Sequence, residues 1–249
     1  MKIVVIGGTG LIGTQLCTLL REGGHDVVPA SPRSGVNAVT GEGLQAALQG
    51  AEVVVDVANS PSFEDAAVLE FFEKSGRNLA TAEKAAGVKH HVALSVVGTE
   101  RMLESGYFRA KMAQEELIKK AGVPFTILRA TQFFEFIGAI VQYSMQGETA
   151  RLTSAALQPV ASADVAQTLA KIAVAPPTGK TEELAGPDKQ PLVSFAKTYL
   201  QHIKDPREVI TDDSAGYYGA IINDQSLTPG AHPILGKIHF DQWLKSASV

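Results

Sequence analysis

Residues 3–13 read Ile-Val-Val-Ile-Gly-Gly-Thr-Gly-Leu-Ile-Gly, so a short apolar run passes directly into glycines at positions 7, 10 and 13. Apolar side chains then recur at helical spacing as far as Arg21, which places the glycines between a strand and a helix. A simple strand-to-helix turn needs only one or two glycines. Three at this spacing permit a tight turn, close approach of backbone N–H groups to a pyrophosphate, and close helix packing. The loop therefore predicts a dinucleotide-binding site formed by Gly7, Thr9, Gly10, Leu11 and Ile12, with the helix N-terminus facing the phosphates.

The rest of the chain alternates short apolar runs with amphipathic segments. The expected strands cover residues 3–6, 27–30, 53–57, 92–96 and 125–128, and the expected helices cover 11–21, 64–86 and 107–120. Near-continuous hydrophobicity is typical of parallel strands that are covered by helices on both faces. The sequence therefore predicts an α/β fold built on a doubly wound parallel Rossmann sheet.

The pattern loosens after about residue 145. Two further helices are expected at residues 164–174, with Ser162 as N-cap, and at 192–202. The C-terminal segment is rich in glycine and proline and carries the aromatic pair Tyr217-Tyr218. We expect a single NAD(P)-binding domain over residues 1–249, with a core of about 1–175 and a small C-terminal substrate-side subdomain, or lid, of about 176–249.

Composition excludes several classes of function. With 22 Lys and Arg against 26 Asp and Glu, the net charge is −4, which disfavours nucleic acid and anionic membranes as partners. No apolar run approaches the roughly 20 residues of a membrane span, and no targeting segment is visible. The single cysteine, Cys17, lies among leucines and is expected to be a buried thiol, as in a cytoplasmic protein. The adjacent His90 and His91 would point to opposite faces of a strand, so no metal site is expected.

The end of the second expected strand indicates which dinucleotide is bound. NAD enzymes place a carboxylate there to hold the ribose hydroxyls, whereas this chain has Ala30-Ser31-Pro32-Arg33-Ser34. Ser31 as a hydroxyl donor and Arg33 as a forked cation would form a corner for a 2′-phosphate. The interpretation is NADP(H); the alternative is that Arg33 is a solvated loop charge beside a vacant ribose site.

Further cofactor contacts are expected where the third and fourth strands end. Ala58, Asn59 and Ser60 follow the third strand, and Val96 ends the fourth. Strand ends of this kind line the ligand crevice of an open α/β sheet. Asn59 either caps a helix or hydrogen-bonds the cofactor, and the sequence leaves both open.

A candidate catalytic set follows the fourth strand. Ser95 lies at the strand end, and Tyr107 and Lys111 are four residues apart on an expected helix, so they share one face. An ammonium beside the phenol and an oxidised nicotinamide both favour the phenolate, and they would lower the pKa of Tyr107 from its usual value near 10. Tyr107 could then exchange a proton with a carbonyl/alcohol couple while Ser95 hydrogen-bonds the same oxygen. Lys111 would also hold the ribose of the nicotinamide half.

With these residues identified, the chain resembles the NmrA-like branch of the atypical short-chain dehydrogenase/reductases. The matching segments are residues 5–13, 86–89, 94–95, 110–115, 123–133, 163–166 and 185–187. The resemblance implies an NADP(H) cofactor, a nicotinamide-side wall at Ala130 and Thr131, and substrate-pocket aromatics at Phe133 and Phe134.

These observations favour an NADP(H)-dependent oxidoreductase that reduces a small carbonyl or quinone-like substrate. Apolar aromatics, among them Tyr143 and Tyr217-Tyr218, would complete its pocket. An alternative from another class is a non-catalytic NADP(H)-sensing regulatory protein of NmrA type. A nucleotide-sugar epimerase or dehydratase is a third hypothesis, although the C-terminal part looks small for one. The expected partner is a small-molecule substrate, and the sequence is compatible with a homodimer.

Overall fold

The computed structural model of the chain describes residues 1–246 and divides into two compact units. The first unit comprises Met1–Arg129 and Val165–Glu182, and the second comprises Ala130–Asp164 and Glu183–Val249. The division differs from the expected boundary near residue 175, because residues 130–164 join the C-terminal part. The last three residues of the expected 176–249 region lie outside the described residues.

A seven-stranded sheet confirms the predicted α/β Rossmann architecture. The strands are β1 (Lys2–Ile6), β2 (Asp26–Ala30), β3 (Val53–Asp56), β4 (His90–Val96), β5 (Phe125–Ala130), β9 (Thr181–Ala185) and β12 (Ile234–Leu235). Their order is β12-β9-β5-β4-β3-β1-β2, and β1 pairs in parallel with both β2 and β3. The chain thus turns first to one side of β1 and then to the other. In open α/β sheets, ligands bind at the carboxyl ends of the strands beside such a reversal.

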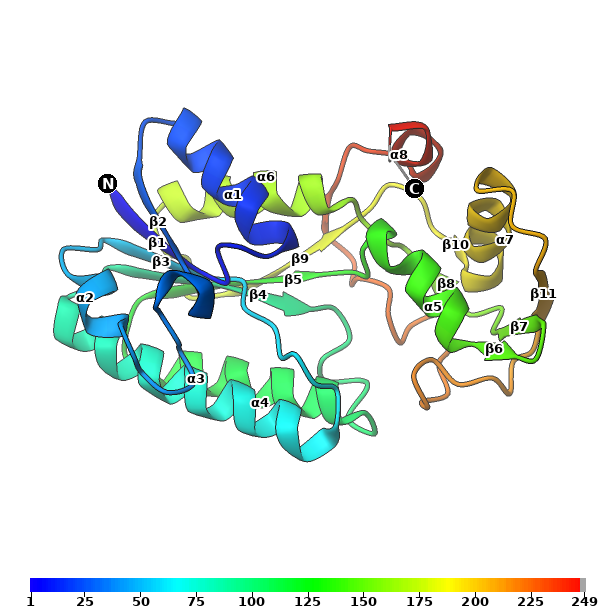
Figure 1. Ribbon diagram of the computed structural model, residues 1–249, viewed down its shortest axis with the longest axis horizontal. Coiled ribbons are helices and arrows are strands. Elements are labelled where there is room, and N and C mark those ends of the chain that lie inside the picture. The colour runs from blue at the N-terminus through cyan, green and yellow to red at the C-terminus, as the bar shows by residue number, and fades with distance from the viewer. Residues whose placement is uncertain (247–249) are drawn as a thin grey trace. The chain divides into compact units, whose positions relative to one another are not determined.

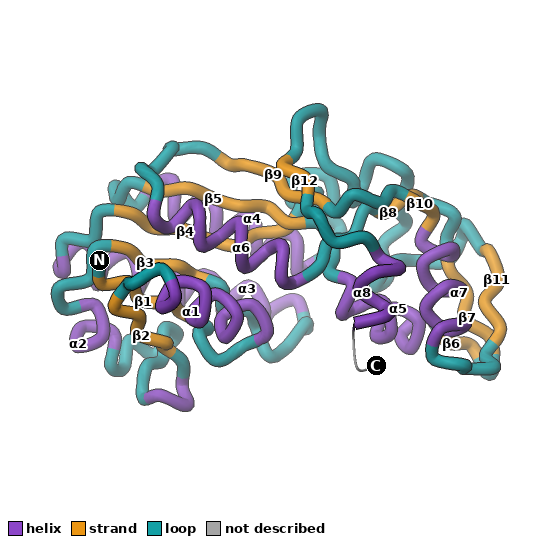
Figure 2. The backbone as a smooth tube through the Cα atoms, turned by 90° about the horizontal axis from the view of Figure 1, so that it is seen from above, coloured by secondary structure: helices purple, strands orange, loops and turns teal. Residues whose placement is uncertain are grey.

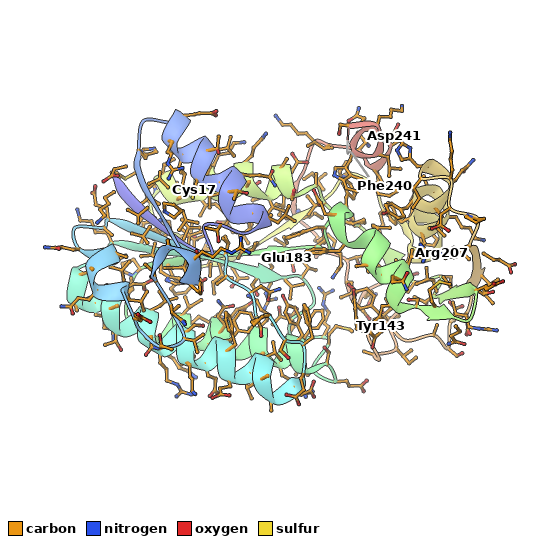
Figure 3. All side chains as sticks on the ribbon, viewed as in Figure 1. Cys17, Tyr143, Glu183, Arg207, Phe240 and Asp241 are labelled. Carbon is orange, nitrogen blue, oxygen red and sulfur yellow. The ribbon has the colours of Figure 1, made fainter. Side chains whose placement is uncertain are left out.

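Helices cover both faces of this sheet (Figure 1). One face carries α1 (Leu11–Glu22) and α6 (Ser162–Val174), and the other carries α3 (Asp65–Ala86) and α4 (Gly106–Lys120), with the short η1 (Pro32–Ser34) and α2 (Leu44–Leu48) between β2 and β3. The central strands β1 and β3 are buried over Ile3–Ile6 and Val53–Asp56, and all of these residues except Asp56 are apolar, as expected of a two-sided sheet. Cys17 lies on α1 (Figure 3), and burial raises the pKa of its thiol, which fits the expected unreactive cysteine.

The paired histidines of β4 point to opposite faces, as the strand period requires. His90 Nε2 lies 2.9 Å from Thr126 Oγ1, and His91 Nδ1 lies 2.6 Å from Glu83 Oε1. Among the described residues, no group of His, Cys, Asp and Glu side chains is arranged to hold a metal ion. Over the same residues, no helix has the length and apolar character needed to cross a membrane.

The second unit contains mostly short helices and strands (Figure 2), and its core is aromatic. They are η2 (Phe134–Phe136), α5 (Ile137–Tyr143), β6 (Met145–Gln146), β7 (Thr149–Leu152), β8 (Ala156–Leu157), β10 (Gln190–Pro191), α7 (Leu192–His202), β11 (Glu208–Thr211) and α8 (Phe240–Ser246). The strands form a β11-β7-β6 sheet and a β10-β8 pair. Phe240, labelled in Figure 3, packs against Phe134 and Phe195 at centroid distances of 5.1 Å each.

One helix start differs from the prediction. The expected N-cap Ser162 is the first residue of α6, and its hydroxyl donates to Glu135 Oε1 at 2.5 Å. The side chain therefore ties the start of α6 to the segment after β5.

Candidate functional site

The glycine loop has the close backbone contacts that its spacing predicts. Gly7 adopts φ +80°, and a Cβ there would lie 2.8 Å from the backbone nitrogen of Ala58. A Cβ on Gly13 would lie 2.2 Å from the carbonyl oxygen of Gly7. Gly10 is the N-cap of α1 and has no side chain to accept from the first turn, while Thr9, Gly10 and Leu11 are exposed. The loop therefore leaves the N-terminus of α1 open to an anionic ligand.

Ser31 and Arg33 lie directly after β2, as expected. The Ser31 hydroxyl is buried and has no hydrogen-bond partner among the described residues. Ser34 Oγ accepts from the Ser31 backbone nitrogen at 2.9 Å and donates to the Pro29 carbonyl, which fixes the corner. Arg33 is exposed. A buried hydroxyl and an exposed guanidinium beside it have the chemistry to bind a phosphate.

The segment after β3 is held by a buried carboxylate. Asp56 is 3% exposed, and its Oδ1 accepts from the Ala58 backbone nitrogen at 3.0 Å. Burial raises the pKa of Asp56, against the opposing effect of His91. Ala58 is half-buried, Asn59 is exposed and Ser60 is buried. Through Ala58, this segment lies against Gly7 of the dinucleotide loop.

Asn59 hydrogen-bonds the Tyr107 side chain, and the N-cap of α3 is Glu64. Helix capping, one of the two roles left open for Asn59, is therefore excluded for α3. The Tyr107 ring packs near Phe63 and Phe72 at centroid distances of 5.6 and 6.4 Å. Burial raises the pKa of Tyr107 to about 12, although the hydrogen bond from Asn59 partly opposes the shift. The expected lowering of this pKa by Lys111 is a misprediction.

The physical reason is where Lys111 points. Its Nζ donates to the Leu94 carbonyl at 2.9 Å and to Gln114 Oε1, and it lies 4.5 Å from the centroid of Phe72. The Phe72 ring thus contacts both side chains. Lys111 is 3% exposed, and burial lowers its pKa to about 8, while Asp56 and Glu115 oppose that shift.

Ser95 is turned toward α4. Side chains alternate along β4, and Ser95 shares the face of His91, which meets α3. Its hydroxyl donates to Glu115 Oε1 at 2.7 Å, and Arg129 donates to both oxygens of Glu115 at 2.9 Å. Although burial raises the pKa of Glu115, hydrogen bonds from Arg129 and Ser95 hold it below its usual value. The proton of Ser95 is therefore engaged by a carboxylate, which the expected contact with a substrate oxygen did not anticipate.

The residues expected to line the cofactor and substrate sites at the ends of β4 and β5 differ in how far they are buried. Val96 is half-buried and Ala130 is buried, and Thr131 Oγ1 donates to the Gln158 carbonyl at 2.7 Å. Phe133 is half-buried and stacks on Phe136 at 5.4 Å. Phe134, expected in a substrate pocket, is 0% exposed, so in this structure it is a core residue of the second unit.

Sequence reasoning expects Asp56 to orient the backbone near the loop, as its bond to Ala58 does, but it missed Gln114 and its hydrogen bond to Asp56. Gln114 lies one turn after Lys111 on α4, and its Nε2 donates to Asp56 Oδ2 at 2.9 Å. The i, i+3 spacing could have placed Gln114 beside Lys111, but nothing in the sequence pairs it with a residue 58 positions earlier.

The comparison with protein families agrees with this geometry. A family model described as NAD(P)H-binding matches residues 7–176. The chain belongs to the NAD(P)H-binding family. This match covers the glycine loop, the segment after β3 and helix α4, and it confirms the NAD(P)-binding family that the resemblance implies.

Two curated relatives of this NAD(P)H-binding protein differ in their described roles. The photosystem II assembly factor Ycf39 of Cyanophora paradoxa is 28% identical over 159 residues, covering 58% of this chain and 49% of its own length. The (4-alkanoyl-5-oxo-2,5-dihydrofuran-3-yl)methyl phosphate reductase of Streptomyces griseus is 29% identical over 144 residues, covering 53% and 48%. The chain spans about half the length of the curated relatives it matches.

Solved structures share the fold at low sequence identity. The dTDP-4-dehydrorhamnose reductase of Bacillus anthracis, in complex with NADP, gives a TM-score of 0.71 at 16% identity, covering 96% of this chain and 90% of that one. MoeE5 in complex with UDP-glucuronic acid and NAD gives 0.76 at 17% identity, covering 98% and 97%. These similarities establish the Rossmann-like fold.

Proposed function

We propose that this protein is an NADPH-dependent reductase of a small carbonyl or quinone-like substrate. The observation that carries the proposal is that the segment after β3 contacts both the dinucleotide loop and Tyr107. Ala58 lies against Gly7 of the dinucleotide loop, and the next residue, Asn59, hydrogen-bonds Tyr107. The proposed proton donor is thereby tied to the backbone that supports the cofactor loop. The similarity to the (4-alkanoyl-5-oxo-2,5-dihydrofuran-3-yl)methyl phosphate reductase of Streptomyces griseus adds support.

The preference for NADP(H) over NAD(H) is part of the proposal. It rests on the buried Ser31 hydroxyl, which has no partner among the described residues, and on the exposed Arg33 beside it. Both would bind a 2′-phosphate, and no carboxylate occupies this corner to repel one. When bound, the cofactor supplies a hydride.

Tyr107 is the proposed proton donor. A phenol whose pKa is raised to about 12 stays protonated at neutral pH, so it can give a proton to a carbonyl oxygen but is a poor base for the reverse reaction. Lys111 uses two of its three N–H groups on Leu94 and Gln114, which leaves one for a ribose hydroxyl. The catalytic role of Ser95 stays a prediction. While its proton is held by Glu115, it can accept a hydrogen bond but cannot donate one to substrate.

For the substrate, the second unit exposes aromatic rings. Tyr143 and Tyr218 are 61% and 45% exposed, and their centroids are 4.6 Å apart. With the half-buried Phe133, they favour a partly apolar and planar substrate.

The test is turnover of NADPH with a panel of carbonyls and quinones, followed by nicotinamide absorbance. We expect sustained NADPH loss with at least one compound, reduced by a factor of about 100 or more in Tyr107→Phe. Tyr199→Phe, on α7 of the second unit, serves as the matched control and should keep the wild-type rate. Undiminished turnover in Tyr107→Phe would remove the proton-donor role.

A second candidate is a non-catalytic NADP(H)-binding regulator, which the similarity to an assembly factor favours. The same panel separates the two functions. Tight NADPH binding without turnover of any compound would support the regulator and contradict the reductase.

A further inference from the structure

Gln114 lies in the interior of the first unit between two charged side chains. It is 2% exposed, its Oε1 accepts from Lys111 Nζ, and its Nε2 donates to Asp56 Oδ2 at 2.9 Å. The two partners fix the orientation of the amide, because an ammonium has only donors and an ionised carboxylate only acceptors. The glutamine therefore connects α4 to the end of β3 in one defined way.

The connection continues to the dinucleotide loop. Asp56 Oδ1 accepts from the Ala58 backbone nitrogen at 3.0 Å. The Ala58 backbone lies so close to Gly7 that a Cβ on Gly7 would come within 2.8 Å of its nitrogen. A continuous series of hydrogen bonds thus runs from the Lys111 ammonium to the backbone that abuts the glycine loop.

The Gln114 amide separates the Lys111 ammonium from the Asp56 carboxylate. Asp56 of β3 and Glu115 of α4 both act on the ammonium, and the His91–Glu83 pair from β4 and α3 acts on Asp56. Among the ion pairs of residues 1–246, none joins Lys111 directly to Asp56, because Gln114 bridges them. An intervening amide holds the ammonium at a fixed point without drawing it onto the carboxylate, so its remaining N–H stays available to a ligand.

We propose that Gln114 is a positioning residue that couples the Lys111 ammonium, through Asp56 and Ala58, to the dinucleotide-binding loop. The inference rests on the proposed function in one respect, that Lys111 contacts the bound dinucleotide. Affinity for the dinucleotide then follows both the bridge and the protonation of Lys111. Because burial lowers the pKa of Lys111 to about 8, NADPH binding should weaken as the pH rises through that value.

The bridge from Lys111 through Gln114 to Asp56 can be broken by a substitution at Gln114 or at Asp56. It can be rebuilt by a double substitution that exchanges the amide and the carboxylate. Gln114→Glu keeps an acceptor for Lys111 but sets two carboxylates against each other. Asp56→Asn leaves a single carbonyl oxygen to serve both Gln114 and Ala58. In the double variant Q114E/D56N, the new carboxylate accepts from Lys111 and from the new amide, whose oxygen accepts from Ala58, so every group again has a partner.

The experiment measures the dissociation constants of NADPH and NADH by fluorescence titration, from about pH 6 to about pH 10, which brackets the lysine pKa. Each single variant should bind both dinucleotides about tenfold more weakly and shift the midpoint of the pH profile. The double variant should return to within about threefold of wild type at neutral pH, and its midpoint should lie above that of wild type because its carboxylate contacts Lys111 directly. Gln45→Met, an exposed glutamine of α2, is the matched control and should behave as wild type.

Wild-type affinity and midpoint in both single variants would overturn the proposal, and so would a double variant as weak as the two losses combined. If the single variants do not fold, binding by the double variant still decides the question. Binding is measured without substrate and with both dinucleotides. If the protein fails to turn over NADPH or does not prefer NADP(H), that result counts against the proposed function. The binding constants of the Gln114 and Asp56 variants would still test the positioning role of Gln114.

Discussion

Burial moves Tyr107 and Lys111 toward their neutral forms. It raises the pKa of the phenol to about 12 and lowers that of the ammonium to about 8. At neutral pH the phenol keeps its proton and the lysine is still charged but close to its titration range. These states suit a proton donor and a ribose-binding cation in a reduction. The i, i+4 spacing predicts a shared helix face, but the intervening ring of Phe72 comes from another helix and has no local signal.

Arg33 carries the prediction about cofactor preference. Arg33→Ala should weaken NADPH binding by about tenfold or more, because a charge-assisted hydrogen bond to a phosphate is lost. NADH binding should change by less than about twofold, since NADH has no 2′-phosphate. Arg77→Ala, which removes an exposed arginine paired with Glu73 on α3, is the control. Equal losses for both dinucleotides, measured by fluorescence titration, would contradict the 2′-phosphate assignment.

At the scale of elements, the strand–loop–helix unit of β1 and α1 was predictable because its signal is local. Glycine spacing and apolar periodicity lie within twenty residues and leave little choice of geometry. Strand β9 was not predicted, because its Thr-Glu-Glu start is polar and follows Pro176-Pro177. The Ser95–Glu115–Arg129 cluster was also beyond the sequence, since its partners come from β4, α4 and β5. Alternation along a strand does not say which face meets which helix.

Gly13 tests the packing of this unit. A Cβ would lie 2.2 Å from the Gly7 carbonyl oxygen and 2.6 Å from Gly8 Cα. Both are backbone atoms, so relieving the clash requires the loop itself to shift. Gly13→Ala should lower the free energy of unfolding by about 1–3 kcal/mol and abolish measurable dinucleotide binding. Gly76→Ala on α3 meets only the flexible Leu117 side chain, at 3.1 Å, and should retain binding. Urea unfolding and NADPH titration of both variants check this, and unaltered binding by Gly13→Ala would contradict the loop geometry.

Strand β4 contributes to acid sensitivity through His90. Burial lowers its pKa to about 4 from 6.5, so the unfolded chain binds the proton more readily between these values. The contribution of His90 to stability is complete above about pH 6.5 and is lost as the pH falls toward 4, by about 3 kcal/mol in total.

His90→Gln should flatten the stability curve of urea unfolding over this range, whereas the exposed His202→Gln should not. Although burial lowers the pKa of His91, Glu83 raises it, so His91 gives the stability curve a slope opposite to that of His90. Subtracting the H90Q curve from the wild-type curve removes the slope that His91 contributes to both. Parallel curves for wild type and H90Q would show that His90 does not titrate as described.

At the scale of the whole molecule, the chain passes three times between its two units, after residues 129, 164 and 182. The sequence indicated the dinucleotide-binding part well, because long helices and buried strands repeat there. It indicated the second unit poorly, because its strands are two to four residues long and its core is assembled from Phe134, Phe195 and Phe240. Substrate identity depends on such scattered aromatics, so only its partly apolar character could be inferred.

The reductase proposal is tested most directly by following the transferred hydrogen. NADPH carrying deuterium at both C4 positions is incubated with the protein and a carbonyl substrate identified from the panel, because an alcohol product keeps the transferred deuterium on carbon, and the product is examined by mass spectrometry. We predict one deuterium in each product molecule at wild type, with product formation strongly reduced in Tyr107→Phe. NADPH binding without labelled product from any carbonyl compound, and without NADPH oxidation by any quinone, would contradict the proposed function.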